Sequence, residues 1–316
     1  MELVKKIVLI ILRISISIGV LIFLFTKVDI HSIAAVLSKM NKPLVCLAFI
    51  VYLLTYLFAF YRWKAIIDGV KIPLKSRQIF LSFAGGMFFN LFLPTSIGGD
   101  FVRSIHLSVH TKKPQEVVAT VILDRLSGYV GLVILALVAI LFGWSIVEDH
   151  LVLFSLGFII FGLLVILCVF FNPFLYKKIN RFLRSDNAGR IRETITGVHQ
   201  QIHCFRGQKT LIVENILISV IIQSIAPVVY FILAAALGIK VSLLPFFIFL
   251  PIISAITLLP ITLGGLGLRE ASAMFFFAKI GILRDQAFAM SLVTFFFMAI
   301  ISGCLGIIYF STARTK

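Results

Sequence analysis

The chain has 316 residues, of which 60% are hydrophobic and 13% are charged, and its formal net charge at pH 7 is +16. A soluble globule of this size needs more polar side chains than this to cover its surface, so the composition excludes a soluble protein and favours a bilayer protein. The excess positive charge flanks apolar segments and forms no separate basic domain, so we expect no nucleic-acid partner and an attraction to anionic lipid head groups.

Six apolar segments are long enough to cross about 30 Å of hydrocarbon, which takes roughly 20 helical residues. They are residues 7–25, 44–61, 117–142, 151–171, 211–237 and 287–310. Two shorter apolar segments, 79–93 and 243–259, each end near a proline and a pair of glycines, and a second apolar arm follows each, at 101–109 and 266–280. No segment alternates apolar and polar residues, so the predicted fold class is an all-α polytopic membrane protein and not a barrel.

Lysine and arginine collect on one side of the predicted spans. Segment 172–210 is strongly basic, whereas Glu148 and Asp149 mark an acidic loop. The positive-inside rule therefore places 172–210, segment 62–77 and both chain ends in the cytoplasm, as expected of a multi-pass plasma-membrane protein. Within 172–210, apolar residues recur at helical spacing opposite basic residues, which predicts amphipathic helices at the membrane surface. The alternative is a solvated helical hairpin with no lipid role.

One short motif occurs twice. Leu93 to Arg103 reads LPTSIGGDFVR, and 166 positions later Leu259 to Arg269 reads LPITLGGLGLR. Proline ends a helix and paired glycines permit a tight reversal, so each motif predicts a helix break at membrane depth. Three predicted spans, an odd number, separate the two breaks. The sequence therefore predicts two re-entrant hairpins, 79–109 and 243–280, related as an inverted repeat within one membrane domain covering residues 1–316.

The arms that leave the two breaks carry candidate substrate ligands. A helix that begins there directs N–H groups at an anion, and Arg103 and Arg269 are predicted one turn inside, where a guanidinium can hold a phosphate. Ser96 and Thr262 are candidate hydroxyl donors to the same ligand. The alternative is that the two breaks only pack closely through glycine.

Further charges lie in apolar surroundings. Asp124 and Arg125 fall inside the 117–142 span, where a charge costs about 3 kcal/mol unless it is paired or hydrated. We expect Asp124 to pair with Arg103, which leaves Arg125 near lipid phosphate; in the alternative, Arg125 only reaches the interface. Asp100, Asp124 and Glu270 are candidates for gating or ion coupling, and the alternative for Glu270 is a helix-start carboxylate. No histidine or cysteine pair has ligand spacing, so we expect no metal or cofactor.

Together with ILDRLSG at Ile122–Gly128, the two motifs resemble the flippase-like membrane domain family, which is named after the transmembrane region of lysyl-phosphatidylglycerol synthase. The resemblance covers the whole chain and implies a lipid translocase with re-entrant elements. The positions that match the family's motifs are Pro94, Gly98, Gly99, Asp100, Arg103, Asp124, Arg125, Pro260, Gly264, Gly265, Gly267, Arg269 and Glu270. The synthase transfers lysine with a separate soluble domain, which we do not expect in a chain that ends at Lys316.

The predicted function is a flippase or scramblase for an anionic phospholipid or a polyprenyl-phosphate-linked lipid, working by alternating access at the two breaks. Its partners are then membrane lipids, together with a separate lipid-modifying enzyme that supplies the substrate. A secondary transporter of a small soluble anion is the first alternative. An enzyme acting on lipid head groups is disfavoured, because no metal-spaced carboxylate pair and no Gly-x-Ser-x-Gly or His-Glu-x-x-His motif occurs. A phosphatidylglycerol lysyltransferase assignment would come from the family name alone.

Overall fold

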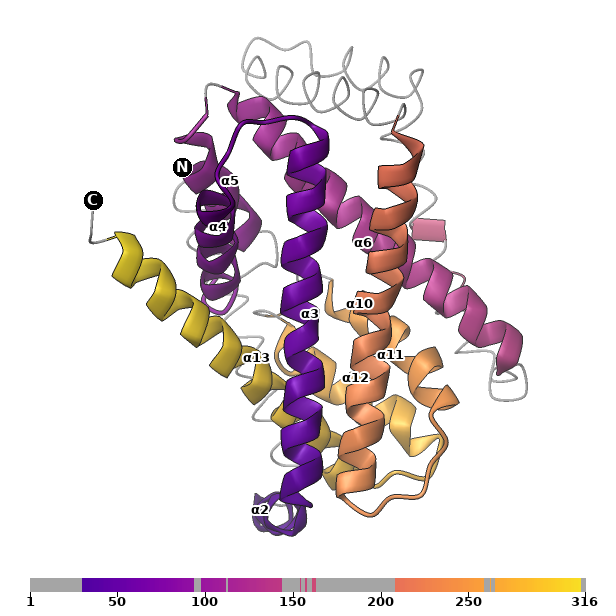
Figure 1. The fold of residues 1–316 in the computed structure, drawn as a ribbon. Coiled ribbons are helices and arrows are strands. Elements are labelled where there is room, and N and C mark those ends of the chain that lie inside the picture. The colour runs from indigo at the N-terminus through magenta and orange to yellow at the C-terminus, as the bar shows by residue number, and fades with distance from the viewer. Residues whose placement is uncertain are drawn as a thin grey trace, which may run out of the picture. The chain divides into compact units, whose positions relative to one another are not determined.

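The computed structural model describes most of the chain outside its N-terminal segment and the long basic segment. The described residues are 30–93, 98–111, 113–143, 154, 157, 161–162, 208–258, 262 and 265–313. Within these ranges the chain forms helices and turns, and none of it lies in a strand (Figure 1). The described part of the protein is therefore all-helical, as its composition predicts.

Four of the described helices are long and apolar enough to cross a membrane. They are α3 (Lys42–Gly69), α6 (Pro114–Phe142), α10 (Lys209–Ala236) and α13 (Arg284–Ala313). A helix of this length extends about 42 Å at 1.5 Å per residue, which exceeds the hydrocarbon thickness. These helices coincide with four of the predicted spans and are candidate membrane spans by length and composition. The span predicted at 7–25 lies outside the described residues, as do nearly all of the span predicted at 151–171 and of the amphipathic segment 172–210.

Two pairs of short helices lie between the long ones. They are α4 (Ser76–Phe89) with α5 (Gly98–Ser108), and α11 (Leu244–Thr257) with α12 (Leu268–Ala278). Each pair brackets one copy of the repeated motif, so the two predicted interruptions are present as helix, break and helix. The prolines of both motifs lie outside the described residues.

The order of helix lengths repeats along the chain. The series α3, α4, α5 and α6 contains 28, 14, 11 and 29 residues, and the series α10, α11, α12 and α13 contains 28, 14, 11 and 30. The repeated motif falls between the two short helices in both series. The helix lengths thus repeat as a series of four, and the sequence motif marks the central break of each series.

The two copies differ in where the second short helix starts. In the first copy, α5 begins at Gly98, so both glycines of the pair are helical and Arg103 is the sixth residue. In the second copy, Gly265 and Gly267 have φ values of 76° and 82°, in the left-handed region that glycine enters without steric cost. Helix α12 therefore begins only at Leu268, and Arg269 is its second residue. The prediction that Arg269 lies one turn inside the helix is wrong, because Gly267 has a left-handed conformation and the helix begins after it.

The chain forms two compact units. Unit 1 contains Met1–Thr55, Ala84–Val102 and Ser224–Lys316, and unit 2 contains Tyr56–Phe83 and Arg103–Gln223. In unit 2, Ile66 of α3 packs with Ala119, Leu123 and Leu126 of α6. In unit 1, the face of α4 at Gly85 and Phe88 packs on Tyr309 and Gly306 of α13. The prediction of one domain over residues 1–316 stays a prediction.

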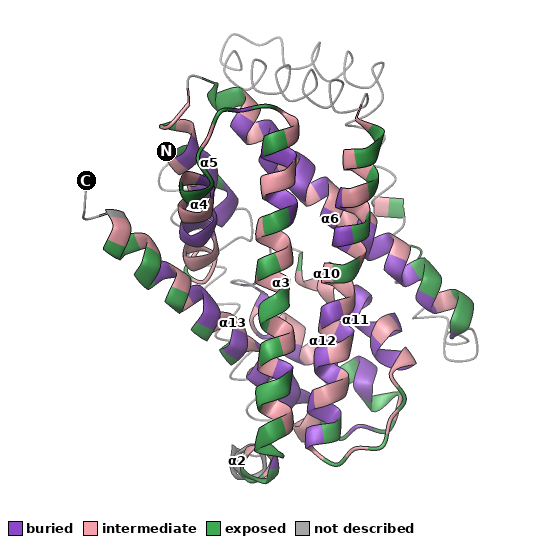
Figure 2. Ribbon diagram, in the orientation of Figure 1, coloured by how far each residue is buried: buried purple, intermediate pink, exposed green. Residues whose placement is uncertain are grey.

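Helix α3 also has a long exposed apolar face (Figure 2). The residues on it include Leu47, Ile50, Leu53, Leu54 and Leu57, each at least 37% exposed. Large aliphatic side chains of a membrane-crossing helix are stable in this position only when hydrocarbon covers them. This face of α3 is therefore the candidate face for contact with lipid.

Helices α6 and α10 approach closely through Gly131. A Cβ atom at Gly131 would lie 2.7 Å from the backbone carbonyl carbon of Ser219, which cannot move aside as a side-chain tip can. We expect Gly131→Ala to lower the free energy of unfolding in detergent by about 1–3 kcal/mol, the usual cost of overpacking. The matched control is Gly303→Ala in α13, where no atom lies within 4 Å of the added Cβ. Equal unfolding temperatures for the two variants would contradict the close approach.

Candidate functional site

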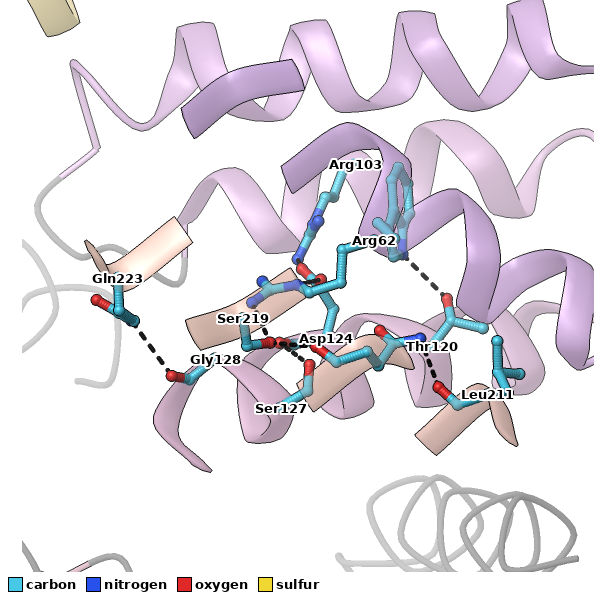
Figure 3. Close-up of polar contacts among 11 residues, drawn as sticks. Arg62, Arg103, Thr120, Asp124, Ser127, Gly128, Leu211, Ser219 and Gln223 are labelled. Atoms are coloured by element: carbon cyan, nitrogen blue, oxygen red, sulfur yellow. Dashed lines mark hydrogen bonds and ion pairs between the residues drawn. The ribbon is translucent and has the colours of Figure 1, made fainter. Parts of the chain in front are cut away.

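A buried ion cluster joins three helices of unit 2. Asp124, the eleventh residue of α6, is 5% exposed. Its Oδ1 accepts a hydrogen bond from Nε of Arg62 in α3 at 2.8 Å, and its Oδ2 accepts one from Nη2 of Arg103 in α5 at 2.9 Å (Figure 3). One carboxylate thus pairs with two guanidinium groups, and we call this set the Arg62–Asp124–Arg103 cluster.

The side chains around the cluster hold both arginines in place. Nη1 of Arg62 donates to Oγ of Ser219 in α10 at 3.0 Å. The guanidinium of Arg103 lies over the Trp63 ring, 4.6 Å from its centroid, an arrangement that favours a cation. The indole N–H of Trp63 in turn donates to Thr120 Oγ1 at 3.2 Å. The positions of both arginines are therefore determined by contacts from three helices.

Glycine makes room for one of these arginines. A Cβ atom at Gly128 of α6 would lie 3.2 Å from Nη1 of Arg62, closer than most side-chain contacts. The carbonyl oxygen of the same residue accepts a hydrogen bond from Nε2 of Gln223 in α10 at 3.2 Å. Small residues and interhelical polar contacts of this kind are how membrane helices associate.

Burial makes the pairing of these charges important. Arg62 is 8% exposed and Arg103 is 2% exposed. A single unpaired charge within a spanning helix costs about 2.5–3.5 kcal/mol, and removing one partner of a buried pair leaves the other charge without compensation. The arginines therefore require an anion beside them at all times. Asp124 provides it in this structure, and the planar fork of a guanidinium fits a phosphate in the same way.

A second ion pair lies in unit 1, at the start of α12. Oε1 of Glu270 accepts hydrogen bonds from Arg269 Nη2 at 2.8 Å and from Ser291 Oγ of α13 at 3.0 Å. Its Oε2 accepts one from the backbone N–H of Gly267 at 2.7 Å. This is the carboxylate half of a capping box, so the contacts of Glu270 are those of a helix-start residue. We call this set the Arg269–Glu270 pair.

The two copies of the motif build their ion pairs differently. Arg103 pairs with a carboxylate 21 positions later, on α6. Arg269 instead pairs with the carboxylate next to it, and it contacts a hydroxyl, that of Ser291, 22 positions later on α13. In the first copy the acidic partner lies on the next long helix. In the second copy the acidic partner is the neighbouring residue, and the next long helix supplies a hydroxyl instead. The sequence predicted two equivalent phosphate clamps, whereas these two arginines have different surroundings.

The remaining predicted site residues are placed as follows. The expected pairing of Asp124 with Arg103 is present. Asp100 is buried in the first turn of α5, and Arg125 is half-buried, one position after Asp124. The hydroxyl of Thr262 is buried and has no hydrogen-bond partner among the described residues. Ser96 lies outside the described residues.

The sequence did not indicate Arg62, Trp63 or Ser219 as site residues. Segment 62–77 was predicted to be cytoplasmic, and this stays a prediction. Helix α3 continues to Gly69 and buries both Arg62 and Trp63 against its neighbours. A signal was available, because Trp63, Ile66 and Ile67 continue the apolar helical spacing of the span beyond its first basic residue.

The fold and the site together define a class. The protein is a helical integral membrane protein that has two broken helical segments and a buried ion cluster joining α3, α5 and α6. The chain belongs to the lysylphosphatidylglycerol synthase TM region family, whose model matches residues 10–306. A comparison with curated proteins finds no match.

Proposed function

We propose that this protein is a flippase or scramblase that moves an anionic phospholipid or a polyprenyl-phosphate-linked lipid between the two leaflets. The observation that carries the proposal is the Arg62–Asp124–Arg103 cluster, buried among long apolar helices in a member of this family. A phosphate group is the lipid feature that two guanidinium groups recognise best. In this proposal the protein transports lipid and is not an enzyme.

The mechanism follows from the cost of an unpaired charge. When no substrate is bound, the carboxylate of Asp124 pairs with both arginines. An entering phosphate accepts some of the hydrogen bonds that Asp124 accepts in its absence. The guanidinium groups therefore exchange one anion for another and always have a negatively charged partner. The breaks between α4 and α5 and between α11 and α12 are the candidate re-entrant elements that move in alternating access.

The proposed location is the plasma membrane, with both chain ends in the cytoplasm. Nε2 of Gln208, just before α10, donates to the carbonyl oxygen of Gly69 at the end of α3, so these two helix ends meet. Exposed basic residues lie near the ends of the helices of unit 2. They are Lys71, Lys75, Arg77, Lys113 and Lys209. Lysine and arginine beside helix ends favour the cytoplasmic side, which supports this orientation.

The proposal is tested by a proteoliposome assay with head-group-labelled lipids and a membrane-impermeant quencher. Wild-type protein is expected to let quenching pass one half of the label, because both leaflets become accessible. Arg103→Ala is expected to lower the initial rate at least about 30-fold, because truncating one member of a buried charge pair costs about 2 kcal/mol or more. The control is Arg284→Ala, an exposed arginine at the start of α13.

Two results would contradict the proposal. One is a folded wild-type protein that moves neither anionic nor polyprenyl-phosphate lipids, in which case uptake of a soluble anion becomes the leading function. The other is full transport by Arg103→Ala, which would separate lipid movement from the cluster.

A further inference from the structure

Helices α3 and α10 meet along a seam within unit 2. Three hydrogen bonds cross it: from Gln208 Nε2 to the Gly69 carbonyl at 2.9 Å, from the Tyr61 hydroxyl to Glu214 Oε1 at 2.9 Å, and from Arg62 Nη1 to Ser219 Oγ at 3.0 Å. Gly69 at the end of α3 is bonded near the start of α10, whereas Tyr61 and Arg62, earlier in α3, are bonded farther along α10. The helices therefore run antiparallel, side by side in Figure 1. We call this contact the α3–α10 seam.

The outer side of the seam is exposed and mostly apolar. Tyr61 is 52% exposed, and Leu57, one turn before it, is 58% exposed. On α10, Leu217 and Ile221 are 59% and 45% exposed. The hydrogen bond between Tyr61 and Glu214 therefore lies at an apolar surface, where a carboxylate is unfavourable unless a polar partner serves it.

The inner side of the seam is the ion cluster. Arg62 follows Tyr61 directly, and it contacts both Asp124 and Ser219. On α10, Asn215 follows Glu214, is 2% exposed, and its Oδ1 has no hydrogen-bond partner among the described residues. On each helix, therefore, one residue takes part in the exposed hydrogen bond and the next residue is buried and polar.

From this juxtaposition we infer that the α3–α10 seam is the lateral entrance through which a lipid head group reaches the Arg62–Asp124–Arg103 cluster. The Tyr61–Glu214 hydrogen bond closes the outer side of the entrance, and polar contacts between membrane helices are weak enough individually for one of them to open. The occupant is the phosphate-bearing head group of a bilayer lipid, whose acyl chains remain against the exposed leucines outside. This inference rests on the proposed function.

Charge on the same side of the protein favours this occupant. Lys64 lies near Tyr61 on α3 and pairs with the exposed Asp68. Lys71 follows the helix, and Lys209 begins α10 beside the seam. Exposed basic residues at a membrane surface attract anionic head groups, so they raise the local concentration of such lipids at the entrance.

A reversible cross-link tests the entrance. In a background lacking the four native cysteines, Tyr61→Cys and Glu214→Cys are combined and bridged by a short bis-methanethiosulfonate reagent after reconstitution. Transport of short-chain labelled phosphatidylglycerol is then followed by albumin extraction, which requires no reductant. We expect the cross-link to lower the initial rate at least about tenfold and dithiothreitol to restore it, because a closed seam blocks the head group. Single-cysteine Leu47→Cys, on the exposed face of α3 away from the seam, treated identically, is the control and is expected to transport normally.

The possible results separate the entrance from the function. If the unbridged cysteine pair transports lipid and bridging leaves the rate unchanged, the entrance is overturned while the proposed function stands. If wild type and the unbridged pair are folded but move no lipid, the proposed function fails and the entrance fails with it. If bridging blocks uptake of inorganic phosphate and no lipid movement occurs, the seam admits a soluble anion and the lipid assignment is wrong.

Discussion

Asp124→Ala is expected to lower the free energy of unfolding in detergent by about 3–5 kcal/mol and to abolish lipid transport. The substitution leaves Arg62 and Arg103 buried and facing each other without the carboxylate that both of them contact. Removing one partner of a buried ion pair has a cost of this size because the remaining charge stays desolvated. The measurements are the thermal unfolding of purified protein and the proteoliposome assay.

The matched control for this variant is Asp68→Ala. Asp68 also lies on a membrane-spanning helix and pairs with a basic residue, Lys64, at 2.6 Å, but its side chain is 53% exposed. An exposed pair contributes at most about 1 kcal/mol, so this variant should unfold close to wild type and transport normally. Wild-type stability of Asp124→Ala would show that the cluster does not hold α3, α5 and α6 together.

Glu270→Ala is expected to lower the free energy of unfolding by about 3–5 kcal/mol as well. The substitution removes the acceptor for Gly267, Arg269 and Ser291 at once, and it leaves a mostly buried guanidinium without its partner. Thermal unfolding measures the loss. Asp285→Ala is the control, since this carboxylate is in the first turn of α13, where an acidic residue contributes about 0.3–1 kcal/mol.

The double variant Arg269→Ala/Glu270→Ala tests the physical cause. If the cost of Glu270→Ala comes from an uncompensated charge, removing Arg269 too should recover part of the lost stability. A double variant that is no more stable than Glu270→Ala would instead assign the whole effect to the lost helix cap at Gly267. Its transport rate also separates the two copies of the motif. Retained transport would show that the Arg269–Glu270 pair only stabilises the structure. Phosphate recognition would then be assigned to the Arg62–Asp124–Arg103 cluster alone.

Sequence reasoning worked where the signal is local. Apolar runs identified α3, α6, α10 and α13, because the length of an apolar run and the thickness of a bilayer are directly comparable. The repeated motif located both helix breaks, because proline and paired glycines act on the backbone near their own positions. The pairing of Arg103 with Asp124 followed from the cost of leaving either charge alone among apolar side chains.

By itself, then, the sequence determined that this is a helical membrane protein and where the described long helices lie along the chain. It also determined that two broken segments carry arginines. Apart from the Arg103–Asp124 pair, only the tertiary structure decided which groups the buried arginines contact. Arg62 is 62 positions from Asp124 and 157 from Ser219, and no local pattern relates residues so far apart. The tertiary structure also decided that Glu270 caps its helix while Asp124 joins three helices, since the start of α12 depends on two left-handed glycines and the cluster depends on where α3, α5 and α6 meet. Contacts between helices depend on how the helices pack in space. The periodicity and composition of a single segment do not show which residues of another helix it will contact.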